Sequence, residues 1–203
     1  MSKPILTSVF LVISLFILSS FSKNDPLFRS TPVDQLTQNK VKTMLVQKGL
    51  YDRYFNENGS GISNRFEVDK NVRVVIDHAT GLMWERSGSN YMMYYEGAQN
   101  YVDSLNNANF AGHNDWRLPT LEEAMTLMKK GKVSPGQLLI DPLFDSEQWW
   151  IVTADQDSTN WAWIVYYSNG YCSANPAGNF FVYVRVVRSI YQEQRPDFSA
   201  VEQ

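Results

Sequence analysis

The stretch GHNDWRLPTLEEAM, residues 112–125, gathers the side chains best able to do acid–base chemistry. The same letters also fit the start of a helix. Thr120 precedes Glu123 by three residues, immediately before an apolar pattern of helical spacing. In such a capping box, each side chain accepts a hydrogen bond from the other residue's backbone N–H. We therefore expect Thr120 and Glu123 to begin a helix over residues 121–131, and we expect Arg117 to pair with an acidic partner.

The chain lacks the complete residue sets that common catalytic and metal sites need. Its only two histidines are His78 and His113, and no nucleophile motif accompanies them. Cys172 is the only cysteine, which rules out an intrachain disulfide and a zinc site built on paired cysteines. We expect Cys172 to behave as a small buried hydrophobe, with an intermolecular disulfide or a reactive thiol as alternatives. The protein is therefore expected not to be an enzyme.

One polar run has the spacing of a weak calcium candidate. Asp155, Asp157 and Asn160 offer the hard oxygen ligands that Ca²⁺ prefers. The run lacks the glycine and the distal glutamate of a helix-loop-helix calcium loop. No cofactor is expected, and calcium at these three residues stays as the alternative.

The ends of the chain differ in composition from its middle. Residues 1–22 combine Lys3, an uncharged apolar run and small residues, which is the pattern of a secretory signal peptide. An uncleaved membrane anchor over residues 5–21 is the alternative. Residues 23–64 are expected to form a linker and a short helical extension, with a helix over 38–48. A domain over residues 65–190 and a tail over 191–203 complete the division.

The predicted elements of the domain indicate an α+β fold. Residues 72–76 and 82–84 have strand composition and flank a turn, so they predict a β-hairpin. Apolar spacing predicts a helix over residues 94–107. Aromatic and β-branched residues predict later strands, and the polar segments between them are expected to be loops. These later strands cover residues 149–153, 161–167 and 180–188, and the loops cover residues 154–160 and 171–179.

Four ordered motifs resemble a bacterial domain family named for the C-terminal domain of the collagen-like adhesin Lcl. They are VIDHATGLMW (75–84), AGHNDWRLPTLEEAMTLM (111–128), IDPLFD (140–145) and YVRVVRS (183–189). The chain is also distantly similar to the formylglycine-generating enzyme superfamily. Both resemblances imply a C-type-lectin-like fold, with a small irregular antiparallel sheet and two main helices. The residues that carry the structural motif are Asp77, Thr80, Gly81, Trp84, Trp116, Arg117, Pro119, Thr120, Glu123 and Arg185.

The resemblance points to recognition by loops late in the chain. Loops 154–160 and 171–179 supply the candidate ligand-binding residues Asp155, Asp157, Asn160, Tyr171, Asn175 and Asn179. Trp161 and Trp163 share one sheet face, and we expect both in the core. The expected ligand is a glycan or an envelope or extracellular protein. A formal charge of −3 argues against nucleic acid and against the sulfated glycosaminoglycans associated with the Lcl domain. An envelope enzyme or a membrane-anchored structural subunit remains an alternative.

Overall fold

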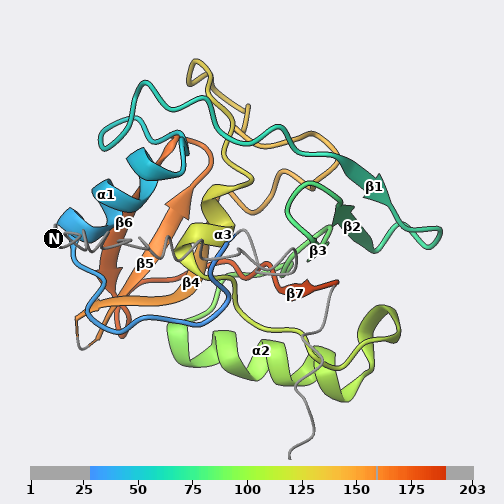
Figure 1. Ribbon diagram of the computed structural model, residues 1–203. Coiled ribbons are helices and arrows are strands. Elements are labelled where there is room, and N and C mark those ends of the chain that lie inside the picture. The colour runs from blue at the N-terminus through green and yellow to red at the C-terminus, as the bar shows by residue number, and fades with distance from the viewer. Residues whose placement is uncertain (1–27, 159, 191–203) are drawn as a thin grey trace, which may run out of the picture.

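The computed structural model describes residues 28–158 and 160–190, so the expected signal peptide and C-terminal tail lie outside the described residues. The described residues form an α+β fold with two antiparallel sheets (Figure 1). The helices are α1 (Gln38–Gln47), α2 (Tyr95–Asn107), α3 (Leu121–Met125) and the 3-10 turn η1 (Phe110–Gly112). The strands are β1 (Phe66–Val68), β2 (Val74–Asp77), β3 (Leu82–Glu85), β4 (Trp150–Ser158), β5 (Trp161–Tyr166), β6 (Tyr171–Pro176) and β7 (Val187–Ser189).

The expected hairpin forms the two central strands of the four-stranded sheet, whose order is β1-β2-β3-β7. Strands β2 and β3 pair with Asp77 opposite Leu82. Asp77 organises the turn between them, because its carboxylate accepts hydrogen bonds from the Ala79 N–H and the Thr80 hydroxyl. Gly81 has a positive φ of 72°, which a residue without a Cβ adopts at little cost. The hairpin prediction is confirmed.

The second sheet has three strands in the order β4-β5-β6, and α3 packs against β4 and β5 (Figure 1). Alternation along the strands divides the core in two. Trp163 and Val165 of β5 join one cluster with α1 and α3, whereas Ala162 and Ile164 join a second cluster with α2. Both sheets contribute to both clusters, so the helices bury both sheet faces.

Residues 28–64, which belong to the expected linker and helical extension, pack on the first cluster. The expected helix is present as α1, and Gly49 with a φ of 66° follows its end. Val41 and Leu45 of α1 are buried in the same cluster as Trp163, as is Phe28. Trp163 also donates from Nε1 to the Leu36 carbonyl over 2.8 Å. Residues 28–64 are therefore part of the packed structure.

Four predicted elements in the second half were wrong in extent. The helix expected over 121–131 ends at Met125, because the chain turns and the Lys129 N–H bonds the Leu139 carbonyl instead. The loop expected over 154–160 is mostly strand, since β4 continues to Ser158. The loop expected over 171–179 begins with the whole of β6. The strand expected over 180–188 is regular only in β7, and isolated bridges replace it earlier.

Candidate functional site

Glu123, in the stretch 112–125, has a structural role. The Thr120 side chain accepts from the Glu123 N–H at 3.2 Å, and the Glu123 carboxylate accepts from the Thr120 N–H at 2.9 Å, which confirms the capping box. Glu123 is fully buried and is also the partner of Arg117, whose two terminal nitrogens donate to it over 2.6 and 2.7 Å. A two-pronged pair of this kind fixes geometry as well as charge. Trp116 is buried beside it, and the Pro119 carbonyl bonds the Ala154 N–H.

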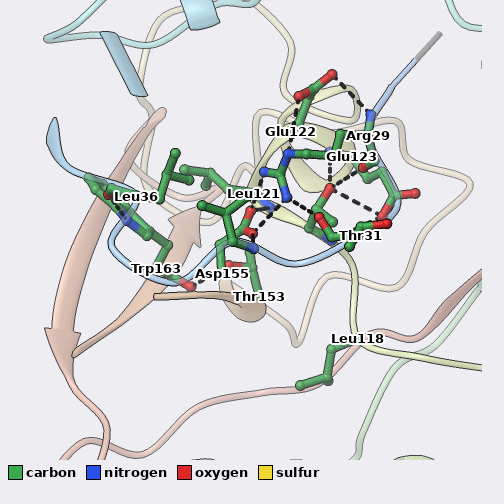
Figure 2. Close-up of polar contacts among 12 residues, drawn as sticks. Arg29, Thr31, Leu36, Leu118, Leu121, Glu122, Glu123, Thr153, Asp155 and Trp163 are labelled. Atoms are coloured by element: carbon green, nitrogen blue, oxygen red, sulfur yellow. Dashed lines mark hydrogen bonds and ion pairs between the residues drawn. The ribbon is translucent and has the colours of Figure 1, made fainter. Parts of the chain in front are cut away.

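Asp155 belongs to the same buried network and not to a ligand surface. Its carboxylate is fully buried and accepts from the Arg29 guanidinium over 2.8 and 2.7 Å. It also accepts from the backbone N–H groups of Val33 and Leu121, each over 2.7 Å. Figure 2 shows the Arg29 side chain directed at Asp155 next to the start of α3. The prediction of a binding role for Asp155 was wrong, because β4 carries this side chain into the interior.

The same contacts engage Asp155, one of the three residues of the calcium alternative. Arg29 and the backbone N–H groups of Val33 and Leu121 together donate four hydrogen bonds to the Asp155 carboxylate, about as many as its two oxygens can accept. Among residues 28–158 and 160–190, no group of three or more His, Cys, Asp or Glu side chains is placed to hold a metal ion. The two histidines contact different residues. His78 bonds Glu67 over 2.7 Å, and the His113 ring packs 6.2 Å from that of Trp116.

A second buried polar cluster joins β3 to the segment just before β7. The Arg185 side chain is buried and donates to the Glu85 carbonyl, the Arg86 carbonyl and the Gln148 Oε1. Burial lowers its pKa. Burial likewise raises the pKa of Glu85, although a hydrogen bond from the Tyr101 hydroxyl at 2.6 Å opposes the shift. These groups bond one another, so Arg185 serves the fold, and Trp84 lies fully buried nearby in β3.

A pocket of about 530 Å³ lies where the start of α2 meets one end of the three-stranded sheet. That size falls within the range of about 300–1,000 Å³ typical of small-ligand sites. The Ala177 N–H donates to the Asn160 carbonyl over 2.7 Å and so holds the two chain turns of the pocket together. The lining residues are Tyr95, Glu96, Gln156, Asn160, Trp161, Pro176, Ala177, Gly178 and Asn179.

The chemistry of the pocket is aromatic, amide-rich and nearly uncharged. Trp161 exposes 43% of its surface and thus presents its indole to the pocket. Gln156, Asn160 and Asn179 supply side-chain amides, each able to donate and to accept hydrogen bonds. Glu96 carries the only charge among the lining residues, and none of them is basic. The arrangement suits a ligand with both hydroxyl groups and apolar faces.

The predicted site residues divide into three groups. Asn160 and Asn179 line the pocket together. Tyr171 and Asn175 lie on β6 and are half-buried, and neither lines the pocket, although Pro176 at the end of the strand does. Asp155 is buried and Asp157 does not line the pocket. The expectation that Trp161 and Trp163 are both core residues holds only for Trp163, because Trp161 begins β5 at the open end of the sheet.

Sequence reasoning missed the contribution of α2 to the pocket. Tyr95 and Glu96 lie about sixty positions before Gln156, so no local pattern connects them. Trp161 gave a partial signal, since a tryptophan directly after a polar turn lies where a strand emerges from the core. Arg29 had no local signal at all, because its partner Asp155 lies in a distant strand.

The fold and pocket describe a small α+β domain with a recessed surface site. The family model described as the Lcl C-terminal domain matches residues 73–188, so the chain belongs to the Lcl C-terminal domain family. Searches of curated proteins and of solved structures returned no match to the chain. No helix within residues 28–158 and 160–190 has the length and apolar character that crossing a membrane requires.

Proposed function

We propose that the protein is an exported, non-enzymatic module that binds a glycan in the pocket between α2 and the three-stranded sheet. The observation that carries the proposal is the exposed indole of Trp161 beside three side-chain amides in one pocket. An aromatic ring packs on the apolar face of a sugar, and amides bond its hydroxyls in either direction. Export rests on the signal-peptide pattern of residues 1–22.

The charge of the pocket sets the expected class of glycan. Sulfate and carboxylate groups are recognised mainly by arginine and lysine, which are missing from the lining residues. Glu96 would repel an anionic ligand at close range. Neutral glycans are therefore favoured over sulfated ones. A C-type-lectin-like arrangement, proposed from the motif resemblance, is consistent with helices on both faces of irregular antiparallel sheets.

The proposal is tested by screening the purified protein against neutral, amino and sulfated glycans. Binding to neutral glycans should be lost in Trp161→Ala and reduced in Asn179→Ala. Tyr91→Ala is the matched control, because Tyr91 is 61% exposed but does not line the pocket. Exclusive binding of sulfated glycans, or binding that Trp161→Ala leaves intact, would contradict the proposal.

A protein ligand is the second candidate. Tyr91, Met92 and Tyr94 are exposed apolar or aromatic residues shortly before α2, and such patches often mark protein contacts. Capture from envelope extract by the wild-type protein, lost in a Met92→Ser variant but kept in Trp161→Ala, would support this candidate over the glycan.

A further inference from the structure

A row of aromatic rings crosses the end of the three-stranded sheet opposite to the pocket. Trp150 of β4, Tyr166 of β5 and Tyr171 of β6 occupy successive paired positions, and Tyr54 follows them. We call these four residues the aromatic row. Consecutive ring centroids lie 6.0 Å apart for Trp150–Tyr166, 4.8 Å for Tyr166–Tyr171 and 5.3 Å for Tyr171–Tyr54. The first three rings are half-buried, and Tyr54 is 69% exposed.

Two connections join the aromatic row to the pocket. Along β6, Tyr171, Ser173 and Asn175 alternate on one face, all half-buried, and Pro176 at the strand end lines the pocket. Asn175 also hydrogen-bonds the Tyr166 side chain, which opposes the rise of the Tyr166 pKa to about 12 caused first by burial.

The second connection runs through the segment before β7. Phe181 stacks on Tyr94 with centroids 4.3 Å apart, and the Phe181 carbonyl accepts from Trp150 Nε1 over 3.1 Å. Tyr94 directly precedes the pocket residue Tyr95. Partly exposed side chains therefore lie along both connections between the pocket and the aromatic row.

We propose that the pocket and the aromatic row form one extended site for a linear neutral polysaccharide, in which several sugar units bind at once. This inference rests on the proposed function, since the pocket is taken to hold one of those units. Aromatic rings next to small polar groups, here Tyr171 followed along β6 by Ser173 and Asn175, suit a chain of sugars, which presents both apolar faces and hydroxyls. The Arg53 guanidinium lies over the Tyr54 ring and so places a cation beside the aromatic row.

The test measures affinity as a function of ligand length. Cello-oligosaccharides and chito-oligosaccharides, from monomer to hexamer, are titrated against the purified protein. In the series that binds, the dissociation constant should fall with length for the wild type. Tyr54→Ala and Tyr171→Ala should weaken binding of the hexamer by about two- to tenfold, the factor expected for losing one aromatic contact. Both should leave binding of the shortest bound ligand unchanged.

The controls separate this inference from the proposed function. Trp161→Ala should weaken short and long ligands alike, and Tyr91→Ala should weaken neither. Tyr54→Ala removes an exposed ring, so a melting temperature equal to that of the wild type will show that folding is intact. An affinity independent of length overturns the extended site but spares the pocket, whereas absence of all glycan binding overturns both. Loss of a dimer in Tyr54→Ala with unchanged hexamer affinity would assign the row to a second copy of the chain and overturn the inference.

Discussion

Arg29 and Asp155 are 126 residues apart in the chain, yet their side chains meet in two parallel hydrogen bonds of 2.8 and 2.7 Å. Arg29 also lies 3.7 Å from Glu122, and its own N–H donates to that carboxylate. Desolvation by burial opposes the charge on Arg29, but Asp155, Glu122 and Glu123 together outweigh it and leave the Arg29 pKa raised. This pair ties the N-terminal segment to β4 and to the start of α3.

Arg29→Ala should destabilise the fold because it leaves the Asp155 carboxylate buried without its cation. Breaking a buried pair costs about 3–5 kcal/mol. Because Arg29 is partly exposed, the expected loss in the free energy of unfolding is about 3 kcal/mol. Denaturant unfolding measures the loss. Arg65→Ala, at an exposed arginine, should change the free energy of unfolding by less than about 0.5 kcal/mol. Equal effects of the two variants would show that the pair is unimportant.

A chain cut to the family match should not fold. Starting at residue 73 removes α1 and exposes the face of Trp163 and Leu121 that it covers. It also leaves Asp155 with neither Arg29 nor Val33. We expect chains starting at residue 28 to unfold cooperatively on heating and chains starting at residue 73 to show no cooperative transition. A sharp calorimetric transition in the shorter chain would disprove the expectation.

Thr120→Ala should cost about 1–2 kcal/mol, the usual loss when a helix N-cap is removed. The Thr120 hydroxyl also donates to the Arg29 carbonyl over 2.7 Å, so the variant loosens the N-terminal segment as well. Thr120→Ser keeps the hydroxyl and should restore most of the stability. Chemical denaturation of both variants checks this, and a serine variant as unstable as the alanine variant would point to packing of the methyl group instead.

The stability of the protein should depend on pH through Glu85. Burial raises the pKa of Glu85 above its ordinary value of 4.5, so the folded state binds this proton more tightly than the unfolded state. The Glu85 contribution is therefore favourable at low pH and is lost as pH rises from 4.5 through the folded-state pKa. The slope of unfolding free energy against pH should become less negative in Glu85→Gln, by up to about 1.4 kcal/mol per pH unit. Glu57→Gln, at an exposed position, should keep the wild-type slope.

Local patterns in the sequence predicted the elements whose contacts are local. The hairpin around Asp77, helix α2 and the capping box of Thr120 each depend on residues within one turn or one strand pair. The Arg117–Glu123 pair spans six residues, and the sequence indicated an acidic partner for Arg117 without identifying it. Such contacts leave a periodic or regularly spaced pattern that the order of the residues reveals.

The errors came where polar residues are buried by distant partners. The segment 154–160 reads as a loop because it is polar, but Asp155 can occupy a strand since Arg29 and Leu121 satisfy it from elsewhere. Strand β6 is polar because it is the edge of its sheet and has one less covered side. Of the residues that line the pocket, the sequence analysis named Asn160 and Asn179 and named none from α2.

The backbone at Asn160 constrains how the binding site could diversify. Asn160 has a φ of 65°, in the left-handed region where glycine, asparagine and aspartate are most readily accommodated. Mutational drift at this rim position is therefore confined to a few amino acids whatever the ligand. Gln156 and Asn179 carry no positive φ, so new specificities in related proteins should arise first at those two positions.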